Sequence, residues 1–117
     1  MNPNTQIGGI NVSIDAIASM TGVIVTECYG VVGMASKKFL KDGWAILLKQ
    51  DNYSKGVVVK ETKTGLSLDI YVIIAYGVRI TEVVSEVQKR VKYELEKTLD
   101  VKFEAINVFV QGIKVVD

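Results

Sequence analysis

The residue types that usually carry catalysis are sparse in this chain of 117 residues. It contains no histidine, which excludes Ser–His–Asp and Cys–His nucleophile systems and imidazole metal sites. The single cysteine, Cys28, cannot form an internal disulfide, and it follows a carboxylate, Glu27, whose charge raises the pKa of a neighbouring thiol. We therefore interpret Cys28 as a buried structural thiol and not as a nucleophile.

The carboxylates do not form a recognisable catalytic or metal-binding pattern. The thirteen Asp and Glu residues are scattered, whereas acid/base pairs need a cleft that separates their pKa values. Asp42, Asp51 and Asp69 are too far apart for a calcium loop. The sequence has no GxxxxGK phosphate loop and no dinucleotide fingerprint. We predict no enzymatic activity, no cofactor and no metal.

A short glycine motif and a basic region are the remaining binding signals. Gly30–Gly33 reads as GxxG, the clamp of KH-type RNA-binding modules, but it fits a tight entry into a strand better. The segment from Lys37 to Lys63 contains seven lysines and three acidic residues. Its local net charge is +4, in a chain whose formal net charge is +1. A surface for an acidic partner, an anionic lipid or nucleic acid is one interpretation, and a solvated helix face is the other. The candidate interaction residues are Lys37, Lys38, Lys41 and Lys49.

The elements that would position these residues follow from hydrophobic periodicity. We expect loose residues 1–8, a strand around residues 10–12, a helix from Ile14 to about Cys28 capped by Ser13, and a strand at Val31–Met34. Residues 36–50 read as a helix on the wheel, with Lys38, Lys41 and Lys49 on its polar side, although WAILL alone resembles a strand.

The second half of the chain predicts a hairpin and then a strand, helix, strand unit. The hairpin joins residues 56–62 and 66–76 around Lys63-Thr64-Gly65. A helix starts near Thr81, with an apolar stripe at Val84, Val87, Val91, Leu95 and Leu99, and a strand covers 103–110. The predicted class is α+β, a single domain of residues 1–117 in the order β-α-β-α-β-β-α-β, with a mostly antiparallel sheet and about three helices packed on it.

No segment predicts export or membrane insertion. The first residues lack a basic start and an apolar core, so they do not resemble a secretory signal. The longest charge-free apolar stretches, 16–26 and 70–78, are shorter than the roughly 20 residues that span a bilayer. We expect a cytoplasmic protein.

Three stretches carry a family resemblance: Leu68–Ile80, Ile106–Ile113 and Tyr29–Met34. With Ile10–Ser13 and Lys55–Val59, they resemble the alkaline shock protein (general stress protein) family of Gram-positive bacteria, over nearly the whole chain. Thr81 stands where members commonly have proline.

The resemblance implies a non-enzymatic cytoplasmic protein linked to envelope or alkaline stress. Some relatives are held at the membrane by a separate anchoring protein and self-associate, and the most similar subgroup is often encoded beside a fatty-acid or dihydroxyacetone kinase-like protein. The leading hypothesis is an interaction or scaffold protein. The alternatives are a small module that binds nucleic acid or an anionic surface through Lys37–Lys63, or a regulatory partner of such a kinase-like protein. Unpaired sheet edges would also make self-association easy.

Overall fold

The computed structural model describes residues 4–7, 10–39, 45–47 and 55–116. Their secondary structure consists of seven strands and two helices. In chain order these are β1 (Asn4–Ile7), β2 (Ile10–Ser13), α1 (Ile14–Thr26), β3 (Val31–Phe39), β4 (Ala45–Leu47), β5 (Val57–Thr62), β6 (Gly65–Ala75), α2 (Ile80–Leu99) and β7 (Phe103–Lys114).

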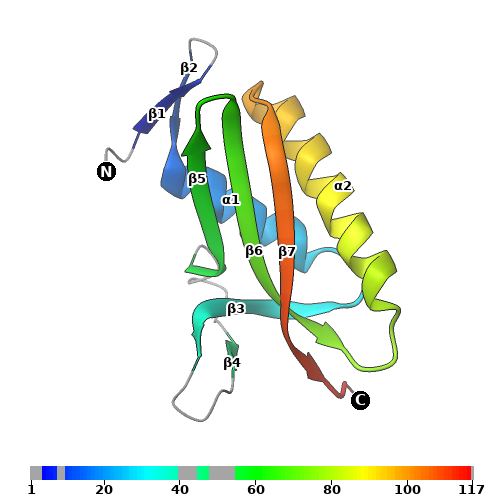
Figure 1. Ribbon diagram of the computed structural model, residues 1–117. Coiled ribbons are helices and arrows are strands. Elements are labelled where there is room, and N and C mark those ends of the chain that lie inside the picture. Colours follow the sequence, from blue (N-terminus) through cyan, green and yellow to red (C-terminus); the bar gives the residue numbers. More distant parts are fainter. Residues whose placement is uncertain (1–3, 8–9, 40–44, 48–54, 117) are drawn as a thin grey trace.

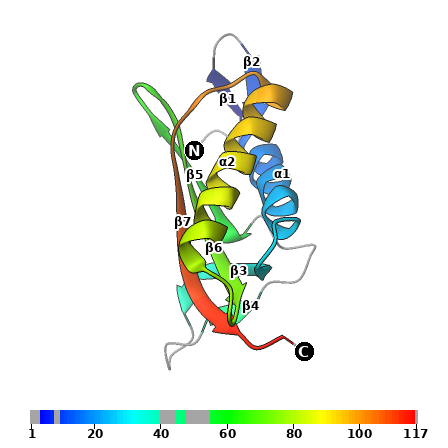
Figure 2. The same ribbon diagram turned by 90° about the vertical axis from the view of Figure 1, so that its right-hand side faces the viewer.

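Strand β6 is the centre of the main sheet. Strands β5 and β3 pair with successive parts of β6, both antiparallel, and β4 extends the sheet from β3. Strand β7 pairs with β6 in parallel along its length, and α2 is the crossover between them. Both helices cover the same face of the sheet (Figures 1 and 2). The α+β class and the mostly antiparallel sheet are therefore confirmed, with one parallel pair that the predicted order does not specify.

Helix α1 begins and ends close to the predicted positions. The Ser13 side chain accepts a hydrogen bond from the Ala16 backbone N–H at 3.4 Å, which confirms the N-cap. Its buried face includes Ile17, Ala18 and Thr21, and the Thr21 hydroxyl returns a hydrogen bond to the Ile17 carbonyl. The helix runs to Thr26 in spite of the β-branched run before it, because that run packs partly into the core.

Helix α2 packs through a stripe displaced slightly from the predicted one. Val87, Val91 and Leu95 are fully buried as expected, but the first buried position is Val83 and not Val84. The helix starts at Ile80, with Arg79 as an N-cap that makes no side-chain cap bond, so Thr81 lies inside the first turn. The predicted helix is confirmed apart from these terminal residues.

The hydrophobic core lies between the helices and one face of β6. Leu66, Leu68, Ile70, Val72 and Ile74 share that face and are fully buried. Asp69, on the opposite face, is only 4% exposed. Its carboxylate lies 2.7 Å from the Lys60 ammonium and accepts a hydrogen bond from the Asn107 amide at 3.0 Å. Beside this polar group, the rings of Tyr71 and Phe109 stack with 5.1 Å between their centroids.

The helix predicted over residues 36–50 is wrong. Residues 36–39 continue β3 and residues 45–47 form β4, paired through Ala35 with Leu47 and Phe39 with Ala45. The apolar residues of this stretch fit either period, and backbone pairing with an existing strand outweighs a helical pattern weakened by Gly43. The described residues thus contain two helices where about three were expected. Asn4–Ile7 also differs from the expected loose start, because it pairs with β2.

Candidate functional site

The predicted lysine surface falls largely outside the described residues. Lys37 and Lys38 lie on β3, not on a helix, and the placement of their side chains is outside the described part of the structure. Lys41 and Lys49 lie outside the described residues altogether. A shared helical face for Lys38, Lys41 and Lys49 is therefore not supported, since residues 36–39 and 45–47 belong to strands. A basic contact surface in this region stays a prediction.

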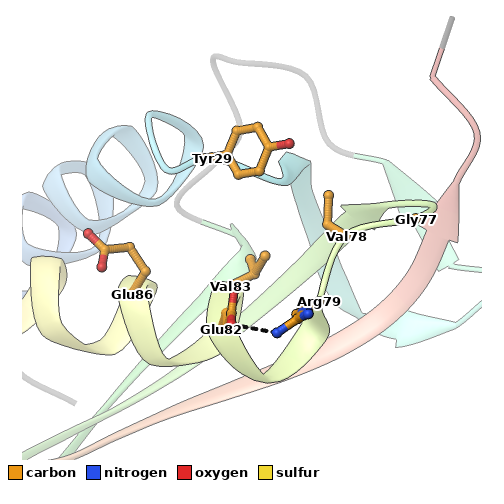
Figure 3. A pocket seen from close by; sticks show the side chains of 7 residues that line it. All are labelled: Tyr29, Gly77, Val78, Arg79, Glu82, Val83 and Glu86. Carbon is orange, nitrogen blue, oxygen red and sulfur yellow. Dashed lines mark hydrogen bonds and ion pairs between the residues drawn. The ribbon is translucent and has the colours of Figure 1, made fainter.

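A concave site lies instead where β6 passes into α2. It is a hollow of about 420 Å³, shown in Figure 3. Three parts of the chain form it: the turn after α1, the loop after β6, and the first two turns of α2 (Figure 3). Its lining residues are Tyr29, Gly77, Val78, Arg79, Glu82, Val83 and Glu86.

Two Tyr-Gly dipeptides bring these parts together. Tyr29-Gly30 enters β3 and Tyr76-Gly77 leaves β6, and the Ala75 N–H donates to the Gly30 carbonyl at 2.9 Å. Gly30 and Gly77 have φ values of +88° and +93°, a conformation that glycine adopts readily. A Cβ on Gly30 would lie 2.7 Å from a Val83 methyl carbon. The Gly30 turn can approach α2 this closely because it has no side chain.

Exposed apolar side chains gather around this end of the molecule. Tyr29 is 83% exposed and Tyr76 is 74% exposed, and the Tyr76 N–H donates to the Lys114 carbonyl near the end of β7. This hydrogen bond brings the exposed C-terminal valines of the chain to the same end, where the chain terminus lies in Figure 1. We call this surface the end patch. It comprises Tyr29, Tyr76, Ile80, Ile113, Val115 and Val116.

The charges beside the hollow are mixed and largely exposed. Arg79 pairs with Glu82 at 3.3 Å across one turn of α2, as Figure 3 shows. Glu86, one turn further, makes no ion pair with any residue that the structure describes, because Arg90 turns to α1 instead. The Arg90 guanidinium lies 3.7 Å from the Glu27 carboxylate and donates to the Glu27 carbonyl at 3.4 Å. It therefore satisfies a carbonyl at the negative end of the α1 dipole.

Cys28 lies beside this junction and is buried. Burial raises the pKa of its thiol, while the nearby Arg90 guanidinium acts in the opposite direction. Its thiol also donates to the Ile24 carbonyl at 3.5 Å. These surroundings stabilise the neutral thiol, so Cys28 is placed as a structural residue and is not poised as a nucleophile.

Among the described residues, no group of three or more His, Cys, Asp or Glu side chains could hold a metal ion. No helix in this part of the chain is long and apolar enough to cross a membrane. Sequence reasoning missed Tyr29 and Tyr76 as surface residues. The repeated Tyr-Gly pair was their available signal, because a positive-φ glycine marks a tight turn that leaves its neighbour outside the core.

Fold and site together define a small α+β domain with an exposed apolar end. The model of the alkaline shock protein family, which is described as having a cell envelope-related function, matches residues 2–115. The chain belongs to this family, and the resemblance seen in the sequence is confirmed.

Relatives of this chain occur in Gram-positive bacteria. An uncharacterized protein of Streptococcus pyogenes serotype M6, Spy1614, is 50% identical over 113 residues, which is 97% of this chain and 93% of that protein. Uncharacterized YloU of Bacillus subtilis is 40% identical over 111 residues, 95% of this chain and 92% of YloU. Uncharacterized YqhY of the same species is 25% identical over 95% of this chain and 81% of its own length. No solved structure matches significantly.

Proposed function

We propose that this protein is a non-catalytic, cytoplasmic interaction domain with an envelope-related role, and that it acts by contacting a protein partner through the end patch. The observation that carries the proposal is the exposure of Tyr29 and Tyr76 on either side of one backbone pairing. The description of the family as cell envelope-related supports the role.

The end patch has the composition of a contact surface. Scattered single apolar residues are normal on a protein surface, but a cluster is typical of an interaction site. Tyrosine is enriched among the residues that contribute most to binding, because its ring buries a large area and its hydroxyl stays hydrogen-bonded. The adjoining hollow is concave and can accommodate a side chain of a partner. The exposed tyrosine rings and the hollow thus lie next to each other on the surface.

Side-chain contact is favoured over strand addition at β7. The register of β7 shifts at Glu104 and again at Gln111, so two bulges interrupt its twelve residues. The Gln88 side chain also donates to the Ile106 carbonyl of this strand at 2.8 Å. Bulges and a covered carbonyl both discourage pairing with another strand. Self-association through the backbone of β7 is therefore disfavoured.

The test is a comparison of two variants in the native cell. Tyr29→Ser combined with Tyr76→Ser removes both exposed rings, and Tyr93→Ser removes an exposed ring on α2 as a matched control. Proximity labelling with each variant should show partners that the double variant loses and the Tyr93 variant keeps. Identical partner sets for wild type and double variant, with both folded by circular dichroism, would contradict the proposal.

A further inference from the structure

The outer face of α1 is unusually poor in charge for a surface helix. Asp15 is the single charged residue among its thirteen residues, and Val23 is 53% exposed. A helix that packs by one face normally carries polar residues on the other, as α2 does. Val23 contributes little to folding from this position, since half of it remains in water. The composition of α1 is that of a helix covered on two sides.

A groove runs between this face and α2. It is shallow and largely open to solvent, with a volume of about 390 Å³. Its apolar lining comes from α1, where Met20, Val23 and Ile24 lie within one and a half turns of each other. Methionine is flexible and polarisable, and it packs against partners of varied shape. The groove is lined by Ser19, Met20, Val23, Ile24, Glu27 and Glu94.

Both charged residues of the groove are carboxylates. Glu27 forms an ion pair with Arg90 at 3.7 Å, and this pair is weak because both groups are exposed. Glu94 makes no hydrogen bond or ion pair with any residue of the described ranges, and the neighbouring Lys97 ammonium lies over the Tyr93 ring at 5.5 Å. An apolar strip with acidic sides complements a segment that is apolar on one face and basic beside it.

We infer that this groove binds an amphipathic helix of a protein partner. The helix would insert an apolar side chain between Met20 and Val23 and place lysine or arginine against Glu27 and Glu94. The arrangement is the helix-in-groove mode, in which anchors recur every three or four residues. The site goes beyond the proposed function, because it is distinct from the end patch and does not require Tyr29 or Tyr76.

The probe is a synthetic helix of about 18 residues, or five turns, built from leucine on one face and lysine on the other. A matched peptide carries glutamate in place of lysine. Chemical shifts in labelled protein should change at Met20, Val23, Glu27 and Glu94 with the lysine peptide. Its affinity should exceed that of the glutamate peptide by about ten-fold at low salt and fall as salt screens the carboxylates.

Two variants make the test specific. Val23→Lys and Glu94→Lys should each weaken the lysine peptide by about ten-fold. Glu61→Lys makes the same charge change on exposed β5 and should leave binding unchanged. The inference would be overturned by equal binding of both peptides, by shifts confined to the end patch, or by a wild-type dimer that Val23→Lys dissociates in light scattering. The last would make a second copy of the chain the occupant. Loss of binding in the Tyr29, Tyr76 double variant would also contradict it.

Discussion

Two valines on α1 allow a matched measurement of which face of this helix is packed. Val25 is fully buried in the core and Val23, two residues earlier, is 53% exposed. Each valine-to-alanine change removes the same atoms from the same helix. The difference between the two changes in unfolding free energy therefore reports burial, since helix propensity is altered equally at both positions.

The expected magnitudes differ several-fold. Removing two buried methyl groups loses about 1.6 kcal/mol of transfer free energy, and the cavity adds about 1 kcal/mol. Alanine returns about 0.5 kcal/mol through its better helix propensity. Val25→Ala should therefore destabilise by about 2 kcal/mol. At Val23 the transfer loss is halved and there is no cavity, so Val23→Ala should change stability by less than about 0.5 kcal/mol.

Urea unfolding followed by far-ultraviolet circular dichroism measures both variants. With a slope of about 2 kcal/mol per molar, the Val25 variant should unfold about 1 M earlier than wild type, and the Val23 variant should unfold with wild type. Equal destabilisation by the two changes would refute the reasoning. It would show that the outer face of α1 is packed in the free protein and that the groove is closed.

Three further outcomes follow from named contacts. Arg90→Gln should destabilise by about 0.5–1 kcal/mol, because it removes the tie to the α1 C-terminus, while Lys89→Gln, on exposed helix surface, should change the urea midpoint little. Cys28 should react with a thiol reagent at neutral pH only as fast as the protein opens, since burial raises its pKa; rapid labelling of native protein would contradict this. The hydrogen bond from Thr62 lowers the pKa of Glu104 below its ordinary 4.5. The stabilising contribution of Glu104 is thus full above about pH 4.5 and is lost as the pH falls through the lowered pKa of the folded protein. Carboxyl titration by NMR should show that the pKa of Glu104 moves back toward 4.5 in the Thr62→Val variant.

The strand, helix, strand unit was predictable because each of its elements has one clear period. Along α2, Val87, Val91 and Leu95 repeat every four residues over a charged remainder, and no alternative element fits. The alternation of β6 likewise placed Leu68 and Ile70 in the core. In this half of the molecule the local sequence pattern agrees with the tertiary environment, so the pattern is enough to predict the structure.

Residues 36–39 and 45–47 were mispredicted because the pattern of this stretch is compatible with two periods. A helical wheel separates Phe39 and Leu47 from the lysines, but in the sheet Phe39 pairs with Ala45 and Leu47 pairs with Ala35 across β3 and β4. What decides between the two is an edge of sheet available for pairing, which is a tertiary fact. The shared face expected for Lys38, Lys41 and Lys49 was argued from that helix, so the argument for a shared face is lost, while the lysine surface itself stays a prediction.

The hollow could not be derived from the sequence, because its walls are about fifty residues apart. Tyr29 lines the same hollow as Val78 and Arg79 because β3 and β6 are antiparallel neighbours, so that the start of one lies beside the end of the other. A list of elements does not state which strands pair. The Tyr-Gly dipeptides were a local signal for two tight turns, and the structure adds that the turns are adjacent.

The most direct test of the end patch is photo-crosslinking in the native cell. A photoreactive phenylalanine is placed at Tyr29, or at Lys63 on the exposed hairpin turn at the other end of β6. Position 29 should give a discrete protein adduct that is absent at position 63 and lost when Tyr76 is also changed to serine. Adducts of equal yield at both positions, or none at position 29, would contradict a contact surface at this end of the molecule.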